Sequence, residues 1–254
     1  MRILHISDIH YRKSFSNNNI YESILANMDS SLSKIETLLN SISNIDCICI
    51  TGDLCDDGNV DDYKTLKDFL NSFKIPYFLC LGNHDNKEAF YKAFYDKDYN
   101  GPYLRENMFD NIPIISFDNS EYGYPNGYLD KDRLTWLKDA INRNPNSIVL
   151  MHHQFHDMSG IPALDNKDEL LKIMNSNVLA ILNGHTHWYK KEDNVFTAPS
   201  ISFRAINANK GVEFFDCFGY CIYEVNDSCI SLVEEKDIQG KLLGIWNPKD
   251  GKLY

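Results

Sequence analysis

Residues 47–58 read CICITGDLCDDG, a short apolar run that is followed at once by glycine and carboxylates. An apolar run of this length bounded by glycine is typical of a buried strand. Similar runs stand at Arg2–Ile6 and Tyr77–Leu81. Apolar residues at helical spacing lie between these runs, over Ile20–Ile42 and Asp61–Phe73. Strands that alternate with helices in this way predict a parallel sheet joined by right-handed crossovers.

The later part of the chain continues this alternation before its pattern changes. Strands are predicted at Pro113–Phe117, Ile148–Met151 and Val178–Leu182, with helices at Lys131–Asn142 and Asp168–Met174. After Trp188 short strands separated by turn residues follow, at Asn194–Thr197, Gly219–Val225 and Cys229–Val233. Their spacing predicts an antiparallel sheet that closes the fold.

The pattern as a whole indicates the α/β class, with two packed sheets and helices outside them. No stretch of linker composition separates the two halves of the chain, so we expect one domain over residues 1–254. Its motif-bearing core covers residues 1–200. The closing antiparallel strands cover about 194–235, and a short C-terminal tail follows.

Charge and composition argue against several classes of protein. The 254 residues include 25 basic and 36 acidic side chains, which gives a net charge of −11. Such a chain lacks the electrostatic footprint of a protein that binds nucleic-acid polymers or anionic membranes, so a bound cation would have to attract any phosphate. No run of eighteen apolar residues suggests a transmembrane helix. The seven cysteines form no C-x-x-C pair, which favours reduced thiols and a cytoplasmic location.

Polar side chains follow five of the predicted strands, at the point where each strand ends. Six of the eight histidines and several carboxylates stand at these places, as Asp8 and His10, Asp53 and Asp56, Asn83, His84 and Asp85, His152 and His153, and His185 and His187. In an open α/β sheet, ligands bind beyond the carboxyl ends of the strands. We therefore expect these side chains to converge on one site.

The residue types at the five strand ends indicate a metal site. Imidazole and carboxylate groups bind divalent Mn, Fe, Zn or Co, whereas a cluster site would need thiolates. Gly52, Gly82 and Gly184 precede the polar residues, as a tight approach of the backbone to a crowded centre requires. The number of candidate ligands exceeds the needs of one tetrahedral ion. Two divalent metal ions are therefore expected, in the arrangement that holds a phosphoryl group during in-line displacement.

The five blocks, in order, resemble the calcineurin-like metallophosphoesterase family. They read D-x-H, G-D-x-x-D-x-G, G-N-H-D, H-H and G-H-x-H, and they span residues 8 to 187. Stretches between them are similar to the bacterial branch of class III cyclic-nucleotide phosphodiesterases and glycerophosphodiesterases: Thr51 to Gly58, Gly127 to Leu129 with Trp136 and Leu137, and Gly160 to Pro162. The sequence departs from this branch where Gln154 and Phe155, instead of prolines, follow the paired histidines.

The resemblance implies a four-layer α-β-β-α sandwich of two mixed sheets flanked by helices. It also implies seven metal ligands in two sets with one shared carboxylate: Asp8, His10 and His187 for one ion, Asn83, His152 and His185 for the other, and Asp53 between them. The register of the motif favours His152 over His153 as the ligand.

Two further residues receive a catalytic role from the resemblance. His84 would face the phosphate and stabilise or protonate the leaving group. Asp56 would orient His84. Among the other histidines, His5 lies inside the first predicted strand and is expected to be a core residue, and His156 is expected in a loop.

The function that we expect is hydrolysis of a small phosphodiester, a cyclic nucleotide or a glycerophosphodiester, by a hydroxide that bridges two divalent metal ions. The alternatives are a phosphomonoesterase acting on a small molecule or a phosphoprotein, a DNA nuclease, and a metal-free interaction scaffold on the same fold. The net charge of −11 disfavours the nuclease, and the presence of all seven ligand positions disfavours the scaffold.

Overall fold

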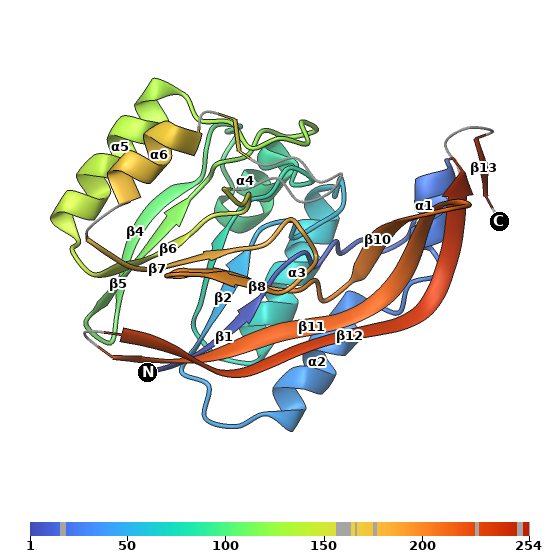
Figure 1. The fold of residues 1–254 in the computed structure, drawn as a ribbon, viewed down its shortest axis with the longest axis horizontal. Helices are drawn as coiled ribbons and strands as arrows, with labels where there is room; N and C mark the ends of the chain where they lie inside the picture. Colours follow the sequence, from blue (N-terminus) through green and yellow to red (C-terminus); the bar gives the residue numbers. More distant parts are fainter. Residues whose placement is uncertain are drawn as a thin grey trace.

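Two mixed sheets lie at the centre of the fold (Figure 1). The structure is a computed structural model that describes residues 1–15, 19–155, 164–165, 167–174, 177–226, 229–247 and 251–253. The first sheet has the order β13-β12-β11-β1-β2-β3, and β10 also pairs with β11. Its strands are β1 (Arg2–Ile6), β2 (Cys47–Thr51), β3 (Tyr77–Cys80), β10 (Phe203–Ala208), β11 (Gly211–Asn226), β12 (Cys229–Asn247) and β13 (Lys252–Leu253).

The second sheet has the order β4-β5-β6-β7-β9-β8. The strands from β5 through β6 and β7 to β9 are parallel, and β4 and β8 are antiparallel edges. Their bounds are β4 (Leu104–Phe109), β5 (Ile112–Phe117), β6 (Ser147–Leu150), β7 (Val178–Asn183), β8 (Lys190–Glu192) and β9 (Val195–Thr197).

Helices cover the outer faces of both sheets (Figure 1). They are α1 (Ile20–Leu25), α2 (Ser31–Ser41), α3 (Val60–Ser72), α4 (Lys87–Tyr95), α5 (Lys131–Arg143) and α6 (Lys167–Met174). Successive residues of β1 face opposite sides, as a strand requires. Leu4 packs with the buried residues of α2, α3 and α4, while Ile3 packs between the sheets with Ile114 of β5. This arrangement confirms the predicted four-layer sandwich.

The helical spacing predicted over Ile20–Ile42 belongs to two helices and not to one continuous helix. α1 ends at Leu25, and α2 begins at Ser31. The Ser30 hydroxyl accepts a hydrogen bond from the backbone N–H of Ser33 and so caps a new helix. The apolar spacing continues through both helices, but the caps decide where each begins and ends.

Of the closing strands predicted near the end of the chain, β11 and β12 pair antiparallel as expected, but they belong to the first sheet. Asn194–Thr197 contributes β9, which pairs in parallel with β7, and β11 pairs antiparallel with β1. Both strands thus extend a central sheet, whose free edge would leave backbone groups unpaired. The last predicted strand continues well past Val233, because β12 pairs with β11 as far as Trp246.

Three further features concern the helices, the cysteines and His5. No helix within the described ranges is both long and apolar enough to cross a membrane. The seven cysteines are free thiols, and all except Cys229 are buried. His5 is fully buried and bonds through its ring to Thr51 and Tyr223, which confirms the prediction of a core histidine.

Candidate metal centre

The predicted site residues meet where β1, β2, β3, β6 and β7 end. Hydrogen bonds between the backbones of these loops hold the strand ends together. Asp8 N–H donates to the carbonyl of Gly52 (3.2 Å), and His10 N–H donates to that of Asp53 (2.8 Å). Gly184 N–H donates to the carbonyl of His152 across the second sheet (3.0 Å). The carboxyl ends of strands from both sheets therefore lie together at the base of one site.

Five of the seven candidate ligands have a backbone in the left-handed region. Their φ angles are 54° at Asp8, 45° at His10, 48° at Asp53, 70° at His185 and 63° at His187. Non-glycine residues rarely adopt this conformation, and it persists only where surrounding structure enforces it. Other residues of the chain, such as Asn44, Lys74 and Asp96, also have positive φ angles, but five at one cluster of candidate ligands is consistent with a site whose geometry serves a function.

Two glycines permit the close approach of these loops. A Cβ atom at Gly82 would collide with the carboxylate and the backbone N of Asp53, and one at Gly184 would collide with the hydroxyl of Ser7 and the carboxylate of Asp8. The prediction that these glycines allow a tight approach is confirmed. Any larger residue would push a candidate ligand out of place.

Three candidate histidines are held through Nδ1 and direct Nε2 toward a carboxylate. Nδ1 of His10 lies 3.0 Å from Asp56 Oδ1, Nδ1 of His152 lies 2.8 Å from the carbonyl oxygen of Thr51, and Nδ1 of His187 lies 2.6 Å from that of Phe203. An imidazole oriented in this way keeps Nε2 available to a metal ion.

The opposite nitrogens of these rings converge. Nε2 of His10 and Nε2 of His152 lie 3.4 Å and 3.3 Å from the same oxygen of Asp53, and Nε2 of His187 lies 3.4 Å from Asp8 Oδ1. His185 approaches through its other nitrogen, because its Nδ1 lies 3.3 Å from His152 Nε2. Asp53 therefore stands between the two halves of the cluster.

The donor set fits divalent metal ions. Potential ligand atoms lie within 4.8 Å of one another in four groups, among them Asp8 with His10 and His187, and Asp8 with Asp53 and His152. Nε2 of His10 and Oδ1 of Asn83 are buried without a hydrogen-bond partner among the described residues. Such orphaned polar atoms are costly unless another group binds them. Ligation of a cation would satisfy both.

The protonation states of Asp53 and His185 suit ligation, whereas burial would lower the pKa of His152 but the Asp53 carboxylate outweighs it and raises that pKa to about 9. Burial opposes the charge on Asp53, yet the rings of His152, His84 and His10 surround it and hold its pKa well below its usual range. Burial and the neighbouring His152 lower the pKa of His185 to about 3, so its ring is neutral at pH 7. An ionised carboxylate and a neutral imidazole are the forms that bind metal.

His84 and Asp56 lie on one side of the cluster and touch each other. Nδ1 of His84 is 2.8 Å from Asp56 Oδ1, and the His84 side chain is 31% exposed, far more than the buried candidate ligands beside it. Burial would lower the pKa of His84, but the charge of Asp53 and the hydrogen bond to Asp56 outweigh it and raise the pKa to about 10. His84 is thus a hydrogen-bond donor that a substrate can reach.

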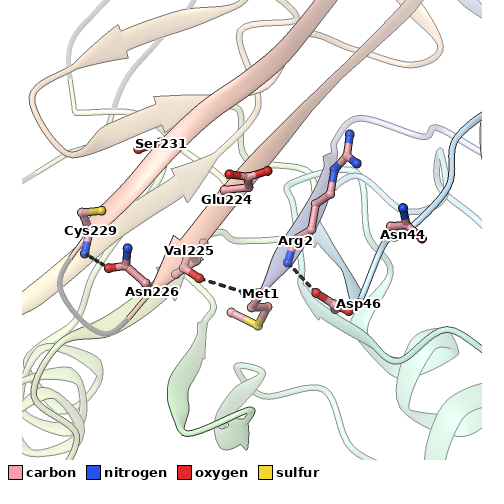
Figure 2. Close-up of a pocket in the computed structure, with 9 residues that line it drawn as sticks. All are labelled: Met1, Arg2, Asn44, Asp46, Glu224, Val225, Asn226, Cys229 and Ser231. Carbon is pink, nitrogen blue, oxygen red and sulfur yellow. Dashed lines mark hydrogen bonds between the residues drawn. The ribbon is translucent and has the colours of Figure 1, made fainter.

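His153 lies beside the candidate ligands, whereas other predicted residues and the pocket at Met1 lie apart from them. His153 is buried with Nε2 3.1 Å from the carbonyl oxygen of Pro125, and it lies beside His152 and His185. His156 and the Gly160 to Pro162 stretch lie outside the described residues. A separate pocket of about 560 Å³ lies at the other end of β1, around Met1, Arg2 and Asp46, and contains none of the predicted site residues (Figure 2).

A sequence model of the calcineurin-like phosphoesterases matches residues 1–189, about three-quarters of the chain and the whole of the strand-end cluster. The chain belongs to the calcineurin-like phosphoesterase family. It is accordingly a phosphoesterase, a hydrolase of phosphoesters.

Relatives of this phosphoesterase lie in one branch of the family. A probable cyclic nucleotide phosphodiesterase of Xenorhabdus bovienii is 27% identical over 238 residues, which cover 88% of this chain and 95% of the relative. A probable cyclic nucleotide phosphodiesterase of Colwellia psychrerythraea is 30% identical over 76% of this chain and 74% of its own. A probable glycerophosphodiester phosphodiesterase of Arcobacter nitrofigilis is 30% identical over 56% of each chain. These relatives confirm the resemblance to that bacterial branch.

Solved structures show the same fold at low sequence identity. A purple acid phosphatase from yellow lupin (Lupinus luteus) superposes with a TM-score of 0.59 at 14% identity, over 100% of this chain and 52% of that one. A hypothetical protein from Thermus thermophilus superposes with a TM-score of 0.55 at 11% identity, over 95% of this chain and 100% of that one. At these identities the likeness concerns the fold alone.

Two residues that shape the phosphoesterase site, Asn119 and Tyr21, were not predicted from the sequence. Asn119 accepts hydrogen bonds from the backbone N–H groups of both His152 and His153 (3.0 and 3.1 Å). It follows β5 directly, so the signal that marked the other strand ends would have found it. The Tyr21 hydroxyl donates to Asp56 Oδ1 (3.1 Å) from α1, and no local motif marks that tyrosine.

Proposed function

We propose that this phosphoesterase hydrolyses small phosphodiesters, cyclic nucleotides or glycerophosphodiesters, with two divalent metal ions. One observation carries the proposal: six of the seven proposed ligands bring potential ligand atoms within 4.8 Å of one another in overlapping groups, and two atoms of the seven residues, His10 Nε2 and Asn83 Oδ1, are buried without a partner among the described residues. Two ions are proposed because Asp53 has candidate ligands on both sides.

The proposed ligand sets follow the geometry of the cluster. Asp8, His10 and His187 would hold one ion, and the other would be held by a second set: Asn83, His152 and His185. Asp53 would serve both ions, because one of its oxygens lies near the rings of His10 and His152. Bound ions of this kind supply positive charge to the phosphoryl group and acidify water.

The residues around the ions would perform the remaining tasks. The hydrogen bond to Asp56 fixes the ring of His84, so that Nε2 can donate to a phosphoryl oxygen or to the departing alkoxide. The high pKa of His84 keeps that proton in place at neutral pH. Asn83 would contribute a neutral oxygen where a further carboxylate would cancel charge needed for an anionic substrate.

Two observations support a small diester as the substrate. The relatives named above are named as probable phosphodiesterases of cyclic nucleotides or glycerophosphodiesters. The net charge of −11 would repel a long polyanion, whereas a small diester carries a single negative charge. We also propose that residues 1–254 form one domain, because the first sheet joins β1–β3 to the late strands β10–β12.

The test is hydrolysis of bis(p-nitrophenyl) phosphate and of p-nitrophenyl phosphate after chelation and reloading with Mn²⁺, Zn²⁺, Fe²⁺ or Co²⁺. We expect the chelated protein to be inactive and at least one metal to restore faster turnover of the diester than of the monoester. A panel of cyclic nucleotides and glycerophosphodiesters then identifies the natural class. Preferential turnover of the monoester would contradict the diester assignment, and activity that survives chelation would contradict the metal requirement.

A further inference from the structure

A short segment beyond the region matched by the family surrounds one half of the metal cluster. Residues 200–204 read SISFR and lead into β10, whereas the match ends at residue 189. The hydroxyls of Ser200 and Ser202 donate to the backbone carbonyl of Asp8 at 3.2 and 2.6 Å. The ring of Phe203 packs against those of His10 and His187, with centroids 4.8 and 4.9 Å apart. The segment thus touches every ligand proposed for one ion.

Arg204 makes the most specific contact of this segment. Its guanidinium donates twice to the backbone carbonyl of His187, from Nε at 3.2 Å and from an Nη at 2.9 Å. The same group lies 3.5 Å from the ring centroid of Trp188 and forms an ion pair with Asp237 of β12. Its side chain is 3% exposed. Arg204 therefore links the β11–β12 hairpin to the loop that carries a candidate ligand.

The contacts of Arg204 complement those of Phe203 on the same histidine. The carbonyl of Phe203 orients the ring of His187 through Nδ1, and Arg204 holds its backbone. That backbone has a φ of 63°, which a histidine adopts only where neighbours enforce it. A ligand fixed at both ring and backbone loses little conformational freedom when it binds an ion. Affinity for that ion should then depend on Arg204.

We propose that Arg204, held by Asp237, is a positioning residue that sets the affinity for the ion bound by Asp8, His10 and His187. The inference rests on the proposed function in one respect, the assignment of those three ligands to one ion. The ion held by Asn83, His152 and His185 should be much less affected, because the side-chain hydrogen bonds of Arg204 go to His187 and Asp237.

The shape of the guanidinium explains why arginine stands at this position. Its planar group donates to the His187 carbonyl and to Asp237 while it stacks on Trp188. A lysine carries a single point charge and cannot make these contacts at once. Arg204→Lys therefore keeps the charge and most of the volume but loses the geometry.

The experiment titrates metal-free full-length protein with Mn²⁺, by calorimetry and by electron paramagnetic resonance, in the wild type and in Arg204→Lys. The matched control is Arg133→Lys, because Arg133 is equally buried, is paired with Glu121 and Asp130, and contacts none of the proposed ligands. We expect Arg204→Lys to weaken one of the two binding steps about 10–100-fold, the usual effect of losing a ligand's supporting partner. Arg133→Lys should leave both steps unchanged.

Asp237→Asn provides a second variant in case Arg204→Lys fails to fold. It keeps an oxygen that can accept from Arg204 but removes the charge, so we expect a smaller weakening of the same step. The spectrum of a coupled Mn²⁺ pair should appear at higher Mn²⁺ concentration in both variants than in the wild type.

The inference would be overturned if Arg204→Lys bound both ions with wild-type affinity. It would also be overturned if both binding steps weakened equally in Arg204→Lys, or if Arg133→Lys lost as much affinity as Arg204→Lys. Activity on bis(p-nitrophenyl) phosphate separates the two proposals. If Arg204→Lys shows the predicted loss of Mn²⁺ affinity relative to the wild type, but the wild type hydrolyses no phosphoester, the proposed function is refuted and the role of Arg204 is supported. A wild type that binds no Mn²⁺ would refute both.

Discussion

At the scale of single residues, one oxygen of Asp56 contacts both His10, a candidate ligand, and His84, the candidate general acid. Oδ1 of Asp56 lies 3.0 Å from His10 Nδ1, 2.8 Å from His84 Nδ1 and 3.1 Å from the Tyr21 hydroxyl. Burial opposes the charge of Asp56, but the bonds to the two histidines outweigh it and hold its pKa below the usual range. One ionised carboxylate can thus orient both rings.

His84 itself should contribute to turnover and not to metal retention. We expect His84→Ala to keep the wild-type metal content, because its ring is held by Asp56 on the exposed side of the cluster. Turnover of a diester should fall about 10²–10⁴-fold, as when a general acid is removed. Elemental analysis and steady-state kinetics measure both quantities. A variant with full activity on diester and monoester would show that the proposed role is wrong.

At the scale of elements, β1 combines an apolar strand with one buried polar residue. His5 lies 2.9 Å through Nε2 from the Thr51 hydroxyl on β2 and 3.4 Å through Nδ1 from the Tyr223 hydroxyl on β11. Burial lowers the pKa of His5 to about 3 from the ordinary 6.5. The histidine therefore remains neutral in the folded strand throughout the physiological pH range.

Acidification should destabilise the fold through His5. Between pH 6.5 and about 3 the unfolded chain binds a proton at this position and the folded chain does not. Stability is therefore complete above pH 6.5 and falls as the pH decreases, by about 2 kcal/mol at pH 5 from this group. Urea unfolding of metal-free protein at pH 8 and pH 5 measures the loss, and His5→Gln should show a loss about 2 kcal/mol smaller. Equal losses in the two proteins would contradict the prediction.

At the scale of the whole molecule, the proposed ions would join the two sheets. Asp8, Asp53 and Asn83 follow strands of the first sheet, whereas His152, His185 and His187 follow strands of the second. Ions bound between them would stabilise only the folded chain, in which these side chains are adjacent. Removal of metal should therefore lower the stability of the entire fold.

The predicted size of this effect follows from mass action. At a free Mn²⁺ concentration of about 100 times Kd, binding to one site adds about 2.7 kcal/mol. For a chain of this length that corresponds to a shift in Tm of about 5–10 °C. Calorimetric melting with Mn²⁺ and with a chelator measures the difference. Asp53→Ala should lose activity and most of the Mn²⁺-dependent increase, since both ions lose a ligand. An unchanged increase in that variant would argue against a shared carboxylate.

Local sequence patterns were sufficient to predict the central strands and the convergence of the five polar blocks. The apolar run Cys47–Ile50 became β2, and the polar groups that follow β1, β2, β3, β6 and β7 do meet. Both results could be read from short stretches of sequence, because side chains alternate along a strand and glycine permits a tight approach. The general rule that ligands bind beyond strand ends then predicted where the polar groups meet. The sequence by itself therefore determined the fold class and predicted eight candidate site residues whose side chains the structure places close together, while their roles stay predictions.

Tertiary contacts decided the rest of the molecule. Helix α4, strand β4 and the full length of β12 were not predicted from the sequence, and they pack or pair with α3, β5 and β11. The supports of the site, Asn119, Tyr21 and Arg204, act on residues 33, 35 and 17 positions away. A hydrogen bond between such distant residues leaves no periodicity in the chain. Its partner is set only when the sheets pack, because packing alone brings the two groups within bonding distance.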